Sequence, residues 1–515
     1  MYSDKENVNI LTSLLVAHGV RHVVVCPGSR NAPIVHNLNE CPDIQCFPVT
    51  DERSAGFYAL GMSQAVNGPV VVCVTSGTAL LNLSPAVAEA FYQHRPLVVI
   101  SADRPPQWID QLDGQTLPQP DALGHFVKRA VSLPEPHDEE SRWYGNRLVN
   151  EALMVSDAPV HINVPISEPL FGFSVDALPK ERVITLTPAD MPPHVLSHIV
   201  RMFMQSKRPL LIAGQPWNPL LDEAALLVAD DERYVPDLVL YTGGSIVSKR
   251  LKRFLRKARE TWVVNATGAV TDTFQNVSRV FVGDGEVVAD QVRFMLEQQP
   301  HPFVEQWNEL LARIGRKVEA YQPAYSEMAV VKCFEETVGA IPVHYGNSSA
   351  IRLANIYSRH PVWCNRGVNG IEGSLSTAAG FSLLSDDLVA CVIGDLSFFY
   401  DQNALWNQNL RGNLRILLLN NGRGGIFNML PGLERSAARD RMVAAAHQTT
   451  AEGICQQNNV GYRKAADSEE MRQGISWLLQ TESSRPLLLE VFTDATEDER
   501  VMRDYYRSLS LNFPS

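Results

Sequence analysis

Short apolar runs rich in β-branched residues alternate with helical stretches along almost the whole chain of 515 residues. This alternation is typical of parallel α/β sheets, in which helices cover the crossovers between strands. Most of the runs are apolar nearly throughout, as expected for strands that are covered on both faces. We therefore predict strands at residues 22–26, 70–75, 97–101 and 160–164, at 210–213, 238–241, 261–264 and 280–282, and at 343–345, 362–364, 388–393, 416–419 and 487–492.

The chain is long enough for roughly three domains, each with its own core. Two loop-like segments divide it. Phe171–Pro193 carries scattered prolines and no sustained period, and Ala320–Ser326 has a proline at its centre. We expect an α/β fold of three doubly wound parallel-sheet domains, which cover residues 1–180, 190–322 and 326–515.

The composition is that of an ordinary globular protein, with 45% hydrophobic and 20% charged residues. The net charge of −12 argues against a nucleic-acid partner, because binding phosphates requires a basic face. The sequence has neither a run of about 18 apolar residues nor a leader-like start, so we expect no transmembrane segment. The eight cysteines include no Cys-x-x-Cys pair, which favours reduced thiols and a cytoplasmic location.

Four predicted strands end in turns of small residues that lead into helical patterns, at residues 26–30, 75–79, 241–245 and 345–349. Ligands of open α/β sheets bind beyond the carboxyl ends of strands, where helix N-termini present free N–H groups. A single turn of this kind serves any strand-to-helix connection. Four of them, two with an arginine nearby, favour anionic ligands.

Asp395 ends one predicted buried strand and Asn421 ends another, 26 residues later, which is the length of one strand–helix–strand unit. Their side chains are therefore expected at the same sheet edge. Mg²⁺ prefers about six oxygen ligands and often shares them with phosphates. A carboxylate, an amide oxygen, a backbone carbonyl and two diphosphate oxygens would nearly complete that set.

This pattern resembles the metal–diphosphate motif of the thiamine-diphosphate enzymes, in which a Gly-Asp pair precedes an Asn-Asn pair. The resemblance implies a bound thiamine diphosphate, and a Mg²⁺ or Mn²⁺ ion held by Asp395, Asn421 and the backbone carbonyl of Arg423. Leu396 stands where the family usually has glycine. That departure points away from pyruvate decarboxylases and acetolactate synthases.

The same family requires a glutamate beside the aminopyrimidine ring of its cofactor. Glu52 fits this place, in the turn Thr50–Gly56 that follows the strand-like Cys46–Val49. A carboxylate in a water-poor site can share a proton with a ring nitrogen. The resemblance therefore implies an acid–base role for Glu52.

Within that family the chain closely resembles the SEPHCHC (2-succinyl-5-enolpyruvyl-6-hydroxy-3-cyclohexene-1-carboxylate) synthases of menaquinone biosynthesis, the MenD family. The resemblance implies a transferase that decarboxylates 2-oxoglutarate and adds the product to isochorismate. It also implies a homodimer or homotetramer with active sites between chains, and a central domain trimmed between residues 213 and 238. The matching segments are residues 27–30, 51–53, 75–79, 101–106, 346–348, 365–367, 375–380, 394–397 and 426–427.

Both substrates carry carboxylates, which guanidinium groups and helix N-termini hold well. The resemblance assigns substrate binding to Ser29, Arg30, Arg104, Lys249, Arg250, Arg352 and Arg366. It assigns catalysis to Glu52, Arg30, Gln115, Arg352 and Arg366, although Gly114 replaces the asparagine that usually precedes this glutamine. It assigns cofactor contacts to Glu52, Thr78, Asn347, Ser348, Ile371, Asp395, Leu396, Ser397, Asn421, Ile426, Phe427 and Leu430.

Two other interpretations stay open at this point. An acetolactate-synthase-like enzyme or a simple 2-oxo acid decarboxylase, in which a flavin could bind, would give the basic residues no purpose. A cofactor-binding scaffold without catalysis is disfavoured, because Glu52, Asp395 and Asn421 are present together.

Overall fold

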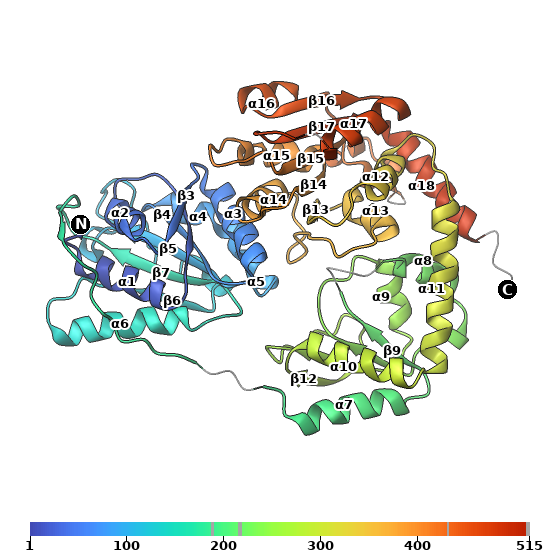
Figure 1. Cartoon of the computed structure of the whole chain (residues 1–515), viewed down its shortest axis with the longest axis horizontal. Coiled ribbons are helices and arrows are strands. Elements are labelled where there is room, and N and C mark those ends of the chain that lie inside the picture. Colours follow the sequence, from blue (N-terminus) through green and yellow to red (C-terminus); the bar gives the residue numbers. More distant parts are fainter. Residues whose placement is uncertain (187–189, 215–218, 430–431, 481, 511–515) are drawn as a thin grey trace.

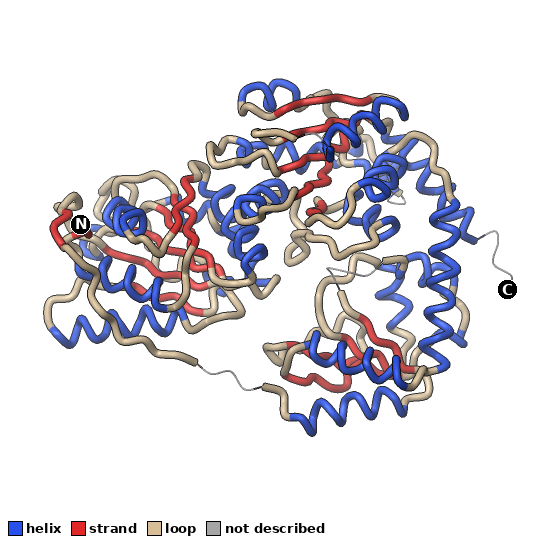
Figure 2. The backbone as a smooth tube through the Cα atoms, in the orientation of Figure 1, coloured by secondary structure: helices blue, strands red, loops and turns tan. Residues whose placement is uncertain are grey.

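The computed structural model describes residues 1–186, 190–214, 219–429, 432–480 and 482–510. Their strands form three parallel sheets of six, four and five strands, which follow one another along the chain (Figure 1). Helices cover both faces of the sheets (Figure 2). An antiparallel pair of β1 (Tyr2–Ser3) and β8 (Phe173–Val175) lies beside the first sheet. The predicted α/β class with several parallel sheets is confirmed.

The N-terminal sheet has the order β3-β2-β4-β5-β7-β6. Helices α1, α2 and α6 pack on one face, and α3 and α5 pack on the other, with the short α4 before α5. The strands are β2 (His22–Val25), β3 (Gln45–Pro48), β4 (Val70–Val74), β5 (Leu97–Asp103), β6 (Arg129–Ser132) and β7 (Val160–Pro165). The helices are α1 (Glu6–Ala17), α2 (Ala32–Glu40), α3 (Glu52–Val66), α4 (Thr78–Asn82), α5 (Ser84–Tyr92) and α6 (Glu139–Leu153).

The central sheet has the order β12-β11-β10-β9, so its strands follow one another in chain order. Between β9 and β10 the described residues form α8 and a short 3-10 turn, with no further strand. The strands are β9 (Pro209–Ile212), β10 (Leu238–Tyr241), β11 (Glu260–Asn265) and β12 (Val277–Val282). The helices are α7 (Pro193–Gln205), α8 (Leu221–Leu227), α9 (Lys249–Leu255), α10 (Gly285–Gln298) and α11 (Pro302–Ala320).

The C-terminal sheet has the order β13-β14-β15-β17-β16. Its apolar residues join those of the central sheet in one core, around α11 and α18. The strands are β13 (Val343–Tyr345), β14 (Val389–Gly394), β15 (Leu414–Asn420), β16 (Gly461–Ala465) and β17 (Leu487–Phe492). The helices are α12 (Glu327–Thr337), α13 (Ser349–Tyr357), α14 (Ser374–Leu383), α15 (Asp395–Tyr400), α16 (Glu452–Gln457), α17 (Ser468–Gln480) and α18 (Ala495–Ser510).

Five strand assignments differ from the sequence prediction. The predicted strand at 362–364 forms only an isolated bridge, between Trp363 and His344. The short strands β1 and β8 were not predicted, and β8 lies in the segment expected to be a linker. The strands β6 and β16 were not predicted either. Both lie at sheet edges and carry charged residues, because an edge strand contacts solvent and lacks the continuous apolar pattern of a central strand.

The N-terminal and C-terminal parts meet where α3 packs on α14 (Figure 1). A Cβ added at Gly61 would lie 1.9 Å from the carbonyl oxygen of Thr377, and one at Gly380 would lie 2.2 Å from that of Tyr58. The two backbones therefore touch, which only glycine allows. A single apolar core runs through this contact from the first sheet to the last.

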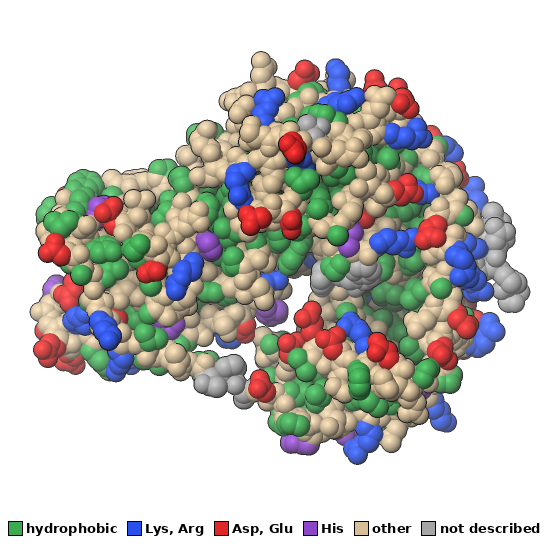
Figure 3. Space-filling model, viewed as in Figure 1, with side chains coloured by type: hydrophobic (Ala, Val, Ile, Leu, Met, Phe, Trp, Pro, Cys, Tyr) green, Lys and Arg blue, Asp and Glu red, His purple; other side chains and the backbone are tan. Residues whose placement is uncertain are grey.

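The distribution of charge on the surface and the hydropathy of the helices are as follows. On the face shown in Figure 3, acidic and basic side chains are intermixed. Among the described residues, no helix is long and apolar enough to cross a bilayer.

Candidate active site

Three neighbouring strands of the C-terminal sheet end in polar turns at one edge. β13 leads into Gly346–Ser348, β14 into Asp395 and β15 into Asn421. Tyr345 pairs with Val392, and Gly394 pairs with Leu419, so the three turns lie side by side. The structure thus brings Asp395 and Asn421 to the same edge.

Asp395 is a buried carboxylate that is held by backbone donors. Its Oδ1 accepts from the N–H of Leu396 at 2.6 Å. Its Oδ2 accepts from the N–H groups of Gly422 at 2.8 Å and Arg423 at 3.2 Å. Burial raises the pKa of the Asp395 carboxyl, and these donors act against that effect.

His447 lies beside the same carboxylate. Its Nε2 is 3.4 Å from Asp395 Oδ2, and its Nδ1 accepts from the N–H of Thr449 at 3.1 Å. An accepting Nδ1 leaves the proton of the neutral ring on Nε2, toward Asp395. Sequence reasoning missed His447, because no motif links it to a residue 52 positions away.

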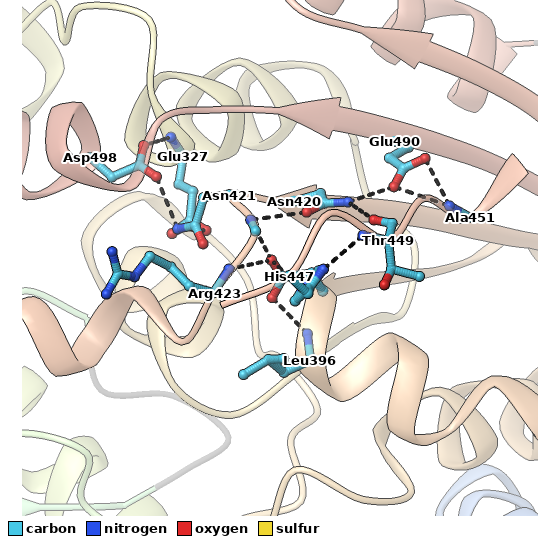
Figure 4. Close-up of polar contacts among 12 residues, drawn as sticks. Glu327, Leu396, Asn420, Asn421, Arg423, His447, Thr449, Ala451, Glu490 and Asp498 are labelled. Carbon is cyan, nitrogen blue, oxygen red and sulfur yellow. Dashed lines mark hydrogen bonds and ion pairs between the residues drawn. The ribbon is translucent and has the colours of Figure 1, made fainter. Parts of the chain in front are cut away.

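Asn421 has its amide orientation fixed by two carboxylates. Its Nδ2 donates to Glu327 Oε1 and to Asp498 Oδ2, each at 3.1 Å (Figure 4). In this arrangement the amide nitrogen faces the carboxyl pair and the amide oxygen faces away from it. Burial and the charges of Asp498 and Asp395 raise the pKa of Glu327 well above its usual range. Glu327 and Asp498 were not predicted from the sequence.

The turn after β13 organises the neighbouring loop of residues 365–371. Asn347 donates from Nδ2 to the carbonyl oxygens of Asn365 at 2.8 Å and Gly370 at 2.7 Å. Its Oδ1 accepts from Arg366 at 3.0 Å. Ser348 follows with φ of 77° and precedes the first turn of α13.

A cavity of about 450 Å³ opens at this edge of the sheet. Its wall consists of polar turns, apolar side chains and basic residues that come from the central and the C-terminal parts of the chain. The predicted residues in its wall are Lys249, Asn347, Ser348, Arg352, Arg366, Ile371, Asp395, Leu396, Ser397, Arg423, Ile426 and Phe427. Leu430 lies outside the described residues.

Five basic side chains line this cavity. Arg423 forms an ion pair with Asp440. The other four, Lys249, Lys252, Arg352 and Arg366, form no ion pair with another described residue. Burial lowers the pKa of Lys252, and the charges of Arg366 and Lys249 lower it further. Burial also lowers the pKa of Arg366. A set of neighbouring cations without carboxylate partners is suited to anionic ligands.

Arg250 points elsewhere in this chain. It forms an ion pair with Asp222, and its guanidinium carbon lies 4.4 Å from the ring centroid of Tyr506. Lys252, which sequence reasoning missed, lines the cavity together with Lys249. The two lysines are three residues apart on α9 and so share one helix face, a spacing that could have identified Lys252.

The predicted residues of the N-terminal part lie at a second sheet edge. Glu52 begins α3 and is half-buried, and its charge acts on the thiol of Cys26 at the end of β2, whose pKa is raised chiefly by burial. The turn after β2 packs closely against Thr75, the residue that follows β4, because a Cβ at Gly28 would lie 2.3 Å from Thr75 Cβ. Ser29 and Thr78 are exposed at this edge.

Arg30 and Arg104 lie together on a shared carboxylate. Glu168 is 3.1 Å from Arg30 and 4.0 Å from Arg104, which also pairs with Asp113 at 3.0 Å. The exposed Gln115 has φ of 57°, and its backbone lies against Gly77, before Thr78. Within the described chain, none of these N-terminal residues lines the 450 Å³ cavity.

Comparisons with known proteins first define a class. Residues 6–124 match the family model of the thiamine pyrophosphate enzymes, N-terminal TPP binding domain. The fold is similar to that of benzoylformate decarboxylase from Polynucleobacter necessarius, with a TM-score of 0.71 at 15% identity over 96% of this chain and 99% of that one. A putative thiamin diphosphate-dependent enzyme from Mycobacterium smegmatis gives a TM-score of 0.69 at 18% identity, over 95% and 100% of the two chains. The family model and the shared fold point to the class of thiamine-diphosphate-dependent enzymes.

Curated relatives then define the family. The 2-succinyl-5-enolpyruvyl-6-hydroxy-3-cyclohexene-1-carboxylate synthase of Bacteroides fragilis is 43% identical, over 99% of this chain and 100% of its own length. The synthase of the same name from Porphyromonas gingivalis is 33% identical, over 99% and 98%. This chain therefore belongs to the SEPHCHC synthase family, which confirms the resemblance seen in the sequence.

Proposed function

We propose that this enzyme decarboxylates 2-oxoglutarate and joins the remaining four-carbon unit to isochorismate. The relatives' name supports this choice. The observation that carries it is the set Lys249, Lys252, Arg352 and Arg366, which shares one cavity with Asp395 and has no ion-pair partner in the described chain. An unpaired, partly buried cation favours a carboxylate-rich substrate.

The residues at the C-terminal edge fit a divalent cation and a diphosphate. Asp395 and the amide oxygen of Asn421 are hard oxygen donors, and with the carbonyl of Arg423 they would hold Mg²⁺ or Mn²⁺. Oδ1 of Asp395 accepts a single N–H bond and keeps a free lone pair, whereas Oδ2 already accepts two. The backbone around Ser348 and Ser397, at the starts of α13 and α15, would bind the diphosphate.

Apolar side chains would hold the cofactor rings, while polar groups would hold protons and carboxylates. We assign ring contacts to Ile371, Ile426 and Phe427. Thiamine diphosphate, when bound, supplies the nucleophile and the electron sink for decarboxylation. Glu52 would hold the proton that it shares with the aminopyrimidine nitrogen. Arg352 and Arg366 would orient substrate carboxylates and keep the reacting carbonyl in place.

The complete site would form between chains of a homodimer or homotetramer. Within the described chain the N-terminal edge with Glu52 does not reach the cavity, and α3 packs tightly against α14. A second copy would supply Glu52, Ser29, Arg30, Thr78, Arg104 and Gln115. We also propose three domains at residues 1–180, 190–322 and 326–515, and a cytoplasmic location, which the eight free thiols support.

The direct test is to incubate the protein with thiamine diphosphate, Mg²⁺, 2-oxoglutarate and isochorismate, and to identify the product by mass spectrometry. The expected product has the mass of the two substrates minus CO₂. A product formed equally well from pyruvate would instead favour the acetolactate-type alternative.

A further inference from the structure

Glu89 is a buried carboxylate of the N-terminal part that binds a loop of the C-terminal part. It lies on α5 and is 3% exposed. Its Oε1 accepts from the N–H of Gly367, and its Oε2 accepts from the N–H of Val368, both at 2.7 Å. Gln93 Nε2 also donates to Oε1, at 2.6 Å. In the described part of the chain no basic side chain forms an ion pair with Glu89, so neutral donors stabilise its buried charge.

The loop that Glu89 holds is residues 365–371, which brings Arg366 and Ile371 into the cavity wall. Asn347 holds the other side of this loop through two of its carbonyl oxygens. A Cβ at Gly367 would lie 2.8 Å from the carbonyl oxygen of Glu89 and 3.0 Å from its Oε1. The loop is therefore clamped between α5 and the turn after β13, with no space for a side chain at residue 367.

Arg366 depends on this clamp for its position. In the described part of the chain its buried Nε has no hydrogen-bond partner, and its guanidinium donates to Asn347 Oδ1 at 3.0 Å. Burial lowers the pKa of Arg366, and the negative charge of Glu89 acts in the opposite direction. Glu89 thus bears on Arg366 through the backbone and through its charge.

We propose that Glu89 is a positioning residue, which fixes the 365–371 loop so that Arg366 meets a substrate carboxylate in the cavity. The inference rests on the proposed function of Arg366 in substrate binding. It makes a residue of the N-terminal part a determinant of affinity at the C-terminal edge of the same chain. A change that weakens the hydrogen bonds from Gly367 and Val368 to Glu89 should displace the Arg366 guanidinium, although Glu89 itself does not contact the substrate.

The test is a double-mutant cycle of Glu89→Gln and Arg366→Ala in the full-length holoenzyme. The glutamine keeps the shape but turns one acceptor into a donor that faces a backbone N–H. We expect a rise of about 10- to 100-fold in KM for the substrate whose KM rises in Arg366→Ala, with kcat changed much less. In the Arg366→Ala background the same change should add less than about threefold, because residues that act through one another are not additive.

Two further variants separate positioning from stability. Gly367→Ala pushes on the same clamp from the loop side and should reproduce the KM effect. Asp401→Asn is the matched control, because Asp401 is also buried and accepts from the N–H of Ser376, without contact to the loop. It should lower Tm and leave KM unchanged.

Amide hydrogen exchange of the apo protein gives a readout that does not need turnover. Gly367 and Val368 should exchange faster in Glu89→Gln than in the wild type. Additive effects in the cycle, or faster exchange with unchanged KM, would overturn the inference. If the wild type forms no product, the proposed function fails, and the same cycle is then measured as the Kd of 2-oxoglutarate.

Discussion

The two sheet edges that carry the predicted residues differ in how complete they are. At the C-terminal edge, Asp395 accepts from the N–H of Gly422, Asn347 accepts from Arg366, and Asp395, Asn347 and Arg366 line one cavity. At the N-terminal edge, Glu52 forms no side-chain hydrogen bond to another predicted residue within the described chain. Arg30 and Arg104 pair with Glu168 and Asp113 of their own part.

The difference supports our proposal that one chain holds two half-sites rather than one site. In this proposal the C-terminal half binds an anion and a cation, and four of its basic residues have no ion-pair partner in the described chain. The N-terminal half has its arginines paired with Glu168 and Asp113, and we expect its Glu52 to act on a ligand bound by another chain. A split of this kind is expected when two copies of a chain complete each other.

The largest effect is expected when the proposed acid–base group of the N-terminal edge is removed. Glu52→Gln should lower kcat by about 10²- to 10⁴-fold, because a carboxamide cannot exchange a proton with the cofactor ring. The affinity for thiamine diphosphate and Mg²⁺ and the Tm should change little. Steady-state kinetics and isothermal titration calorimetry measure these quantities, and unchanged turnover by a folded variant would remove Glu52 from the mechanism.

The basic residues of the C-terminal edge should decide substrate choice. The wild type should prefer 2-oxoglutarate to pyruvate by roughly 30- to 4000-fold in kcat/KM, since pyruvate leaves a partly buried guanidinium unpaired. Arg352→Ala or Arg366→Ala should erode this preference, whereas Arg30→Ala or Arg104→Ala should weaken isochorismate binding instead. The measurement is kcat/KM for both oxo acids in each variant. Equal use of pyruvate by the wild type would contradict the proposed function.

Removing the carboxylate of the proposed metal site should weaken cofactor binding at the C-terminal edge. Asp395→Ala should weaken metal-dependent binding of thiamine diphosphate by about 100-fold or more, because the remaining protein ligands are neutral oxygens. Calorimetric titration with the cofactor and Mg²⁺ checks this directly. Near-wild-type affinity would place the cation elsewhere.

Mixing this variant with Glu52→Gln tests the division between chains. Each parent should be inactive. A randomly mixed dimer population should regain about a quarter of wild-type activity, because a mixed dimer holds one site with both residues intact. No recovery in co-expressed, purified mixed dimers would mean that both residues serve one site within a chain.

The smallest effect is expected at the contact that holds the two edges apart. Gly61→Ala should lower the free energy of unfolding by about 1–3 kcal/mol, because its methyl group would strike the carbonyl oxygen of Thr377. Gly68→Ala is the matched control, since its nearest neighbour to an added Cβ is 3.7 Å away. Denaturant unfolding of both variants measures the difference. Equal stability would show that α3 and α14 can separate at little cost.

The sequence predicted the parallel sheets well, because a buried strand carries its signal in its own residues. The ends of β14 and β15 were also predictable, since Asp395 and Asn421 stand one crossover apart and must share an edge. The edge strands β6 and β16 gave no such signal, because polar residues on a solvated strand resemble those of a loop.

The supporting residues could not be predicted for a different reason. Glu89 binds backbone N–H groups 278 residues away, and Glu327 and Asp498 come from the first and last helices of the C-terminal part. In the sequence each is an ordinary carboxylate at or in a helix, with nothing nearby to mark its partner. Lys252 could have been predicted, because its spacing from Lys249 places both lysines on one helix face.

The backbone contact at Gly61 and Gly380 also has a consequence for motion. Helices that touch without side chains between them have few alternative arrangements, so the N-terminal and C-terminal parts should move as one rigid body. Closure over a bound substrate then falls to the remaining wall of the cavity, which α9 supplies with Lys249 and Lys252. This helix follows Gly243 and Gly244, with φ of 91° and 83°, where the chain can turn at low cost. Because the central and C-terminal sheets share one core, we expect any closure to involve the turn before α9 rather than a movement of the whole central sheet.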